Sequence, residues 1–372
     1  MFESEFCLDE SIIHLNHAAV SPWPRCTAAA VKAFADENAS LGSRHYLDWV
    51  RNEQYLKEQL RQLINAQSSD EIALLKNTSE ALSTVAYGLA WKRGDNVVIT
   101  SQEFPSNRIV WESLGKYGVE TRPADLDQGD SPEAAVLACI DNNTRLVAVS
   151  SVQYGTGLRL DLEHIGASCH KRGILFCVDA IQSLGAIGFD VQACRADFVM
   201  ADAHKWMLGP EGIALFYCRA EAMDRLDLKQ YGWHMVEDQG NYDRRDWEIA
   251  VSARRFECGS PNMIGVHALH ASLSLLHGVG MPTIEKLVME NSAYLIEQID
   301  RHSDYRLITP REAARHAGII SFAPLNDTPE TLYARLVECN VLCAVRAGGV
   351  RFSPHFYTPR EKLDQALDLL DG

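Results

Sequence analysis

Short apolar runs alternate with amphipathic stretches through the first 220 residues of the chain. Turn-forming residues bound these runs, and their length and composition suit buried parallel strands. They lie at residues 72–75, 96–100, 146–150, 174–178, 198–201 and 213–217. Helical periodicity is found at residues 25–38, 46–64, 106–116 and 131–140. Strands that alternate with helices predict an α/β fold, with a mostly parallel sheet covered by helices.

The alternation stops after about residue 221. Residues 230–247 are polar and aromatic, which indicates an ordered loop, and residues 265–300 show one long helical pattern. Short strands at 305–309 and 318–322 then alternate with helices at 329–339 and 359–370, as is typical of a small α+β domain. We therefore expect a large domain at residues 21–254. Residues 1–20 and 255–372, including the connecting helix, are expected to form the small domain.

Charge and cysteine content exclude several classes of protein. The 372 residues include 35 basic and 50 acidic side chains, a net charge of −15, so no basic field draws nucleic acid or an anionic membrane. No apolar run approaches the ~18–20 residues of a membrane span, and the acidic start has no secretory core. The ten cysteines show no metal-ligand spacing. We expect reduced thiols, no metal site and a cytoplasmic location.

Two of the apolar runs each deliver an ionisable residue at the carboxyl end of the expected strand. Asp179 follows the run at 174–178, and Lys205 lies shortly after the run at 198–201. Ligands of open α/β sheets bind at this edge. Alone, the aspartate could be a helix cap and the lysine a solvated charge. Together they suit a cofactor with a cationic ring nitrogen and an aldehyde, which describes pyridoxal 5′-phosphate (PLP).

The chain resembles the class V aminotransferase superfamily of fold type I PLP enzymes, which includes cysteine desulfurases, selenocysteine lyases, isopenicillin-N epimerase and kynureninase. The matching segments are VDAIQ at 178–182, AHK at 203–205, RFECGSPN at 255–262 and RFSPHFY at 351–357, with a phosphate-loop match at 78–79. The resemblance implies a large domain built on a mostly parallel sheet and a small C-terminal α+β domain. It also implies a homodimer with shared active sites.

The resemblance assigns roles around the cofactor ring. Lys205 would bind the cofactor aldehyde and shuttle the substrate's α-proton, because a primary amine partly withdrawn from water has a lowered pKa. Asp179 would keep the ring nitrogen protonated, so that the ring accepts electrons. Gln182 would hydrogen-bond the ring hydroxyl, although a solvated glutamine is an alternative. Tyr154 is a further candidate, equally compatible with an ordinary aromatic residue at a strand end.

The cofactor phosphate requires N–H groups and hydroxyls, which a helix N-terminus supplies. Thr78 and Ser79 open a helix after a strand and match the family's phosphate loop; a cap without a ligand is the alternative. By resemblance, His204 adds a donor. Ser260 takes the position whose hydroxyl reaches the phosphate bound by the other subunit.

Two positions depart from the desulfurase pattern. Asp202 stands where those enzymes typically have a phosphate-binding serine, and its anion would repel the phosphate unless it turns away or pairs with a cation. Phe104 stands where they have a histidine that stacks on the ring. Phenylalanine stacks equally well but transfers no proton. Arg351 matches the family's substrate-carboxylate arginine, and Arg346 is a second substrate-binding candidate.

The strongest departure is a missing loop. Related desulfurases have an extended loop with a nucleophilic cysteine where this chain has only four residues between Arg346 and Arg351. Attack on substrate sulfur requires a reachable thiolate. We therefore expect a PLP enzyme that deprotonates Cα of an α-amino acid and leads to transamination, epimerisation or elimination. A cysteine desulfurase or selenocysteine lyase with a thiol from elsewhere, and a non-catalytic PLP-binding homodimer, are the alternatives.

Overall fold

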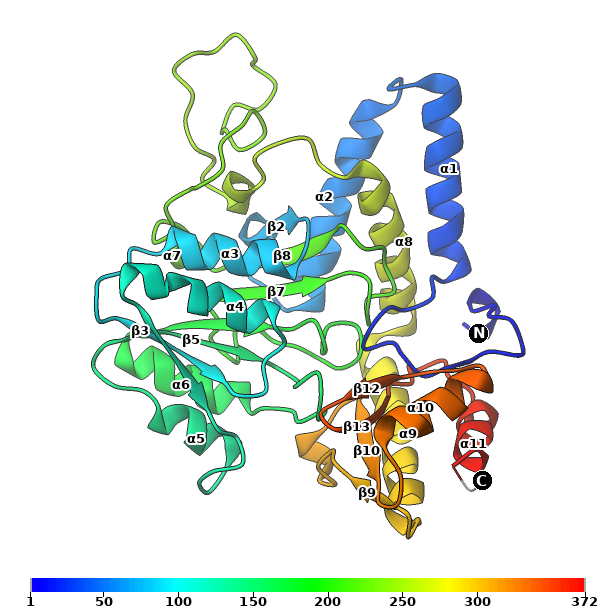
Figure 1. Cartoon of the computed structure of the whole chain (residues 1–372). Coiled ribbons are helices and arrows are strands. Elements are labelled where there is room, and N and C mark those ends of the chain that lie inside the picture. Colours follow the sequence, from blue (N-terminus) through cyan, green and yellow to red (C-terminus); the bar gives the residue numbers. More distant parts are fainter. Residues whose placement is uncertain (1, 371–372) are drawn as a thin grey trace.

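The computed structural model describes residues 2–370 and gathers every strand predicted in the first 220 residues into one sheet (Figure 1). The strands are β2 (Ile72–Leu75), β3 (Asn96–Thr100), β4 (Glu120–Ala124), β5 (Thr144–Ser150), β6 (Leu175–Asp179), β7 (Phe198–Asp202) and β8 (Ala214–Cys218). Their order across the sheet is β2-β8-β7-β6-β5-β3-β4. The strand β8 has the opposite direction and pairs antiparallel with β2 and β7, whereas the other pairs are parallel, so the prediction of a mostly parallel sheet is confirmed.

Helices cover both faces of this sheet. The core on one face includes α3 (Thr78–Gly88), α4 (Ser106–Glu112) and α7 (Ala220–Met223). The core on the other includes α2 (Tyr46–Leu63), α5 (Pro132–Ala138), α6 (Leu162–Arg172) and α8 (Met263–Val279), and α1 (Arg25–Leu41) packs along α8. In β6, Leu175 and Cys177 enter the first core, whereas Phe176 and Val178 enter the second. Both faces are buried, which is why these strands are continuously apolar in sequence.

A second, four-stranded antiparallel sheet has a separate apolar core, at the lower right of Figure 1. Its order is β12 (Ala344–Arg346), β13 (Gly349–Phe352), β10 (Ile320–Pro324) and β9 (Tyr305–Leu307), and it packs with α9 (Met281–Arg301), α10 (Pro329–Glu338) and α11 (Arg360–Asp368). The strand β1 (Ile13–His14) pairs in parallel with β11 (Val341–Leu342). The N-terminal segment therefore lies against the C-terminal part of the chain. Short 3₁₀ turns are η1 (Glu3–Glu5), η2 (Ser69–Glu71), η3 (Ser113–Tyr117), η4 (Ala253–Phe256) and η5 (Ala313–Arg315).

The fold differs from the sequence prediction in several places, among them the strands β12 and β13, which were not predicted. The single helix expected at 265–300 is wrong, because Gly280 (φ +86°) ends α8 and Pro282 lies in the first turn of α9. The edge strand β4 was not predicted, since it is largely polar and contains Pro123. The helix α6 was also missed between β5 and β6. Within residues 2–370, no helix is both long enough and apolar enough to cross a membrane.

Candidate active site

A cavity of about 210 Å³ lies where the carboxyl ends of β6 and β7 meet the hairpin of β12 and β13. The structure brings together every predicted site residue except Ser260. The residues that line the cavity include Thr78, Ser79, Phe104, Tyr154, Asp179, Gln182, His204, Lys205, Arg346 and Arg351. Ser260 is exposed and borders a separate cavity of about 260 Å³. One chain therefore supplies an amine, a carboxylate and two guanidinium groups to one cavity.

Lys205 has fewer hydrogen bonds and ion pairs than the other charged groups of the cavity. Its side chain is only 8% exposed, and none of the described residues offers Nζ a hydrogen bond or an ion pair. Burial lowers the pKa of this amine to about 8, although Asp179 opposes the shift. The ring of Phe104 lies 5.6 Å from Nζ, on the more exposed side of the cavity. An amine in this environment is partly neutral near physiological pH and can accept a proton.

Asp179 is the buried carboxylate of the cavity, with 2% exposure. Its Oδ1 accepts a hydrogen bond from the Ile181 N–H at 3.0 Å. Burial raises the pKa of Asp179 to about 7, against the influence of Lys205. A cationic group beside this carboxyl would lower its pKa and stabilise the ionised form.

Gln182 and a close backbone contact fix the turn after β6. The Gln182 Nε2 donates to the Ala18 carbonyl at 3.1 Å, and Oε1 accepts from Trp206 Nε1 at 2.9 Å. Gly185 has φ +95°, and a Cβ there would lie 2.2 Å from the Trp206 carbonyl oxygen. Only glycine permits this approach. The two segments that supply Asp179 and Lys205 are thereby locked against each other.

The start of α3 is held by the end of β7. Asn77 caps the helix by accepting from the Glu80 N–H at 2.9 Å. The Thr78 N–H donates to Asp202 Oδ1 at 2.7 Å, and the Asp202 N–H donates to Thr78 Oγ1 at 3.1 Å. The sequence left the role of Asp202 open, because its anion would repel a phosphate unless it turned away or paired with a cation. The carboxylate instead binds the N-terminal N–H of the helix.

Two further groups lie at this end of the cavity. His204 Nδ1 is buried without a hydrogen-bond partner and lies 3.6 Å from Asp202 Oδ2. Burial lowers the pKa of His204 to about 4, so the ring is neutral and donates through one nitrogen. Ser79 Oγ donates to Ser106 Oγ at 2.8 Å. Ser106 lines the cavity as well, but the sequence pattern gave it no role.

Arg351 of β13 lines the same cavity and is buried, with 2% exposure. Its Nη1 donates to the Tyr154 carbonyl at 2.8 Å and Nη2 to Asn16 Oδ1 at 3.4 Å, whereas Nε has no partner. Burial lowers the pKa of Arg351 to about 9, which leaves the guanidinium charged at neutral pH. Asn16 was missed in the sequence because its contact with Arg351 spans 335 positions.

A tight hairpin beside Arg351 takes the place of the extended loop that the sequence comparison with desulfurases led us to look for. Arg346 and Gly349 form the last pair of β12 and β13, and only Ala347 (φ +50°) and Gly348 (φ +71°) connect them. Two positive φ values are typical of a tight two-residue hairpin turn. Arg346 is exposed at the cavity rim. No cysteine is among the residues that line the cavity.

The residues present fit PLP. Lys205 Nζ is buried and lacks a partner among the described residues, and the buried Asp179 carboxyl faces the same cavity. The hydroxyls of Thr78 and Ser79 and the unpartnered His204 Nδ1 lie at the start of α3. An aldehyde, a ring nitrogen and a phosphate would satisfy these three sets of groups.

Comparison with known proteins supports this assignment. The family model for class-V aminotransferases matches residues 13–362. The chain belongs to the class-V aminotransferase family. It is 32% identical over 389 residues to a probable cysteine desulfurase of Methanothermobacter thermautotrophicus, covering 96% of this chain and 94% of the relative.

Solved structures of known proteins show the same fold. The apo cysteine desulfurase of Thermococcus onnurineus NA1 superposes with a TM-score of 0.86 at 27% identity, covering 97% of this chain and 94% of that one. A lysine-to-alanine mutant of C-DES, with glycine covalently linked to its PLP cofactor, has a TM-score of 0.89 at 21% identity and covers 97% of both chains. This member of the class-V aminotransferase family therefore has the α/β architecture of fold type I. It is a PLP-dependent enzyme that acts on an amino acid, as predicted.

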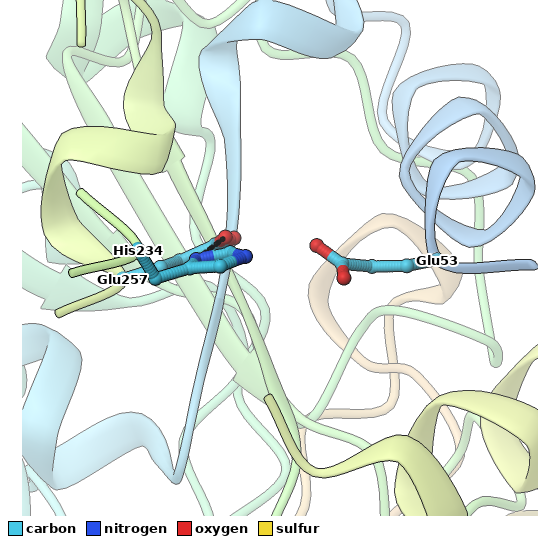
Figure 2. Close-up of side chains that lie close together, drawn as sticks. All are labelled: Glu53, His234 and Glu257. Atoms are coloured by element: carbon cyan, nitrogen blue, oxygen red, sulfur yellow. Dashed lines mark ion pairs between the residues drawn. The ribbon is translucent and has the colours of Figure 1, made fainter. Parts of the chain in front are cut away.

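A second cluster of ionisable groups lies outside the cavity. Figure 2 shows Glu53 of α2 pointing toward His234 and Glu257, whose ligand atoms all lie within 4.8 Å of one another. Lys57 Nζ already lies 3.1 Å from Glu53 Oε1 and 2.8 Å from Glu257 Oε1. Burial lowers the pKa of Lys57, but the two carboxylates outweigh it and raise the pKa overall. An ammonium group therefore occupies the place that a metal ion would take.

Replacement of Lys57 by methionine should destabilise the protein by about 3–5 kcal/mol, because it leaves two buried carboxylates without their cation. Urea unfolding would measure this loss. The matched control is Lys286→Met, since Lys286 is exposed and lies 3.8 Å from Glu290, a pair expected to contribute at most about 1 kcal/mol. Equal losses in both variants, together with a rise in wild-type melting temperature on addition of Zn²⁺, would instead indicate a metal site.

Proposed function

We propose that this chain is a homodimeric enzyme that removes the α-proton of an α-amino acid, with Lys205 as the group that accepts and returns the proton. The observation that supports this most strongly is the unpaired Lys205 amine, which shares its cavity with Asp179 and Arg351. A general base is most effective when its pKa lies near the working pH. The lowered pKa of Lys205, about 8, meets this condition.

Each residue of the cavity has a role in this proposal. When bound, PLP supplies an electron-withdrawing ring that stabilises negative charge at the substrate's α-carbon. Asp179 would hold the proton on the ring nitrogen, and Gln182, already anchored by Trp206, would contact the ring hydroxyl. Phe104 would cover the exposed face of the ring and exclude water. Arg351 would bind the substrate carboxylate.

The remaining residues divide between the two ends of the cavity. Thr78, Ser79 and His204 would hold the phosphate at the start of α3. Arg346, exposed at the rim, would contact the part of the substrate that lies farthest from α3, and Tyr154 would position both Arg351 and Phe104. The Tyr154 carbonyl accepts from Arg351, and its ring packs edge-on against Phe104 at a centroid distance of 5.1 Å.

We also propose that residues 21–254 form the cofactor-binding domain, and that residues 1–20 and 255–372 form the small domain with its connecting helix. The separate apolar core around β10 and β13 supports this division. The helix α8 packs into the core of the large sheet, so it would form the joint between the two. A cytoplasmic location is supported by the cysteines, all of which are free thiols.

A second candidate function is cysteine desulfuration, which the name of the M. thermautotrophicus relative favours. The nearest cysteine to the hairpin in sequence is Cys343. It is only 4% exposed, and burial raises the pKa of its thiol to about 12, so it is not a thiolate at neutral pH. Desulfuration would therefore need a thiol other than Cys343, from a more distant cysteine or from another molecule.

Exchange of the α-proton in heavy water distinguishes these functions. The purified protein with PLP would be incubated with single amino acids, and loss of the α-proton followed by NMR. Keto acid, ammonia, racemised substrate and sulfide would be assayed in parallel. We expect exchange for at least one amino acid without any dependence on protein cysteines. Rapid sulfide release from cysteine that disappears in a Cys258→Ser, Cys339→Ser or Cys343→Ser variant would establish the desulfurase function instead.

Replacement of Ser260 by alanine should weaken PLP binding without unfolding the subunit, because this exposed hydroxyl is proposed to reach the phosphate bound by the second subunit. Loss of one hydrogen bond to a charged group corresponds to about 1.5–3 kcal/mol, or roughly ten- to hundred-fold in affinity. Equilibrium titration with PLP and sedimentation of the dimer would measure both effects. Ser303→Ala, an exposed serine beyond α9, is the control. A monomer with full PLP affinity would contradict the shared site.

A further inference from the structure

The carboxylate of Asp202 occupies the position at which a helix N-terminus binds an anion. Its Oδ1 lies 2.7 Å from the Thr78 N–H, and Thr78 Oγ1 accepts from the Asp202 N–H in return. The helix α3 has 11 residues, so its N-terminal N–H groups carry the positive end of a full helix dipole. The unpaired Lys205, more than nine-tenths buried, lies in the same cavity. The cavity therefore suits a ligand. Asp202 accepts a hydrogen bond from the Thr78 N–H, which is one of the donors that the cofactor phosphate would use.

We propose that Asp202 is an internal anion that competes with the cofactor phosphate for the Thr78 N–H, and that the phosphate binds at this helix end with uptake of one proton by the Asp202 carboxyl group. This inference rests on the proposed placement of the phosphate at Thr78 and Ser79. It assigns to this carboxyl group the control of cofactor affinity by pH.

Electrostatics makes proton uptake the expected outcome of phosphate binding. Asp202 is mostly buried, and burial raises its pKa to about 6 before any phosphate arrives. A phosphate dianion beside it would raise that pKa further, because two adjacent anions in a poorly solvated site repel each other. Once protonated, the carboxyl group has an O–H and can donate a hydrogen bond to a phosphate oxygen. It then does what a serine hydroxyl would do.

The charged groups around Asp202 shift its pKa in opposite directions, so the bound phosphate decides whether its carboxyl group is protonated. From the segment that follows β7, Lys205 lowers the pKa of Asp202 and Glu211 raises it, while the neutral His204 ring lies 3.6 Å away. At the end of β6, Asp179 interacts with Asp202 as a second carboxylate. The helix α3 faces it with the N–H and hydroxyl of Thr78.

The sign of the pH dependence follows from the proton balance. The complex binds more protons than the free protein, so the affinity for PLP should fall as pH rises through the free-form pKa of about 6. The limiting slope is tenfold per pH unit, and it ends where the carboxyl group of the complex itself ionises.

The test compares the dissociation constants of PLP for the wild type and for Asp202→Asn between pH 6 and 9. The asparagine keeps an oxygen acceptor for the Thr78 N–H and cannot ionise. The ratio of the two constants cancels the titration of the phosphate itself. We expect the wild-type constant to increase relative to that of the variant by about tenfold or more between pH 6 and 8. Asp202→Ser, which carries the residue of the desulfurases, gives a second comparison if the asparagine variant fails to fold.

Two controls test whether the pH dependence comes from the cofactor phosphate and Asp202. Pyridoxal, which lacks the phosphate, should show a ratio that does not change with pH. Glu211→Gln removes a nearby exposed charge without touching Thr78, and should leave the wild-type pH dependence of PLP binding in place. Calorimetry at pH 7 in buffers of different ionisation enthalpy should detect up to one more proton taken up by the wild type than by Asp202→Asn.

A PLP ratio that is independent of pH would overturn the inference. An equal slope for pyridoxal would also overturn it, since Asp202 would then act on Lys205 rather than on the phosphate. Ser79→Ala tests the placement on which the inference rests. If this variant weakens PLP but not pyridoxal while the Asp202→Asn ratio is flat, only the inference fails. If it binds PLP at full affinity, the proposed phosphate site fails.

Discussion

Replacement of Lys205 by alanine should abolish turnover while the protein still binds PLP. The variant loses the group that accepts and returns the substrate's α-proton, and general acid–base catalysis alone contributes about 10²–10⁴-fold. The contacts proposed for the phosphate and the ring do not involve this side chain, so the cofactor should remain bound noncovalently. Product formation and α-proton exchange measure the loss, and the visible spectrum measures retention of PLP.

The expected covalent attachment of PLP to Lys205 can be checked chemically in the same preparation. Borohydride treatment of the wild type should leave PLP attached to a peptide that contains Lys205, and the alanine variant should yield no such peptide. Lys171→Ala, an exposed lysine in the last turn of α6, should behave as the wild type in every assay. A modified peptide elsewhere in the chain, or a Lys205→Ala variant with normal turnover, would contradict the assignment.

The position of the candidate residues at the sheet edge was predictable because its signals are local. In β6 and β7, a continuous apolar run is followed within a few residues by Asp179 or Lys205, and parallel strands place such residues at one edge. The resemblance to the class V aminotransferases then gave the cofactor. The short connection between Arg346 and Arg351 was also visible, and the structure explains it as a tight turn at Ala347 and Gly348.

Features that depend on distant contacts were not predictable. Asp202 and Thr78 are 124 positions apart, so the sequence showed an anion in the phosphate region but not the N–H that binds it. The contact of Asn16 with Arg351 exists only because β1 brings the N-terminal segment beside β11. The break at Gly280 was visible in principle, but apolar periodicity continues through it and concealed the boundary between α8 and α9.

Replacement of Arg351 by alanine should raise KM steeply and lower kcat less. The guanidinium is charged, buried and available through its unpartnered Nε, so it suits a two-point contact with the substrate carboxylate. Each hydrogen bond to a charged group is worth about 1.5–3 kcal/mol, which predicts roughly a hundred- to thousand-fold or greater loss in kcat/KM. A contact made equally in the ground and transition states appears chiefly in KM. Steady-state kinetics with the substrate found by proton exchange measures both constants.

Arg351→Lys separates the shape of the contact from its charge. Lysine keeps the positive charge but not the planar fork, so its kcat/KM should lie between those of the wild type and the alanine variant. Arg351 also donates to the Tyr154 carbonyl, and its loss could disturb the wall of the cavity. The melting temperature and PLP content of each variant therefore need to match the wild type before the kinetics are compared. A well-folded Arg351→Ala variant with an unchanged KM would show that the substrate carboxylate binds elsewhere, and Arg346 would then be the next arginine to test.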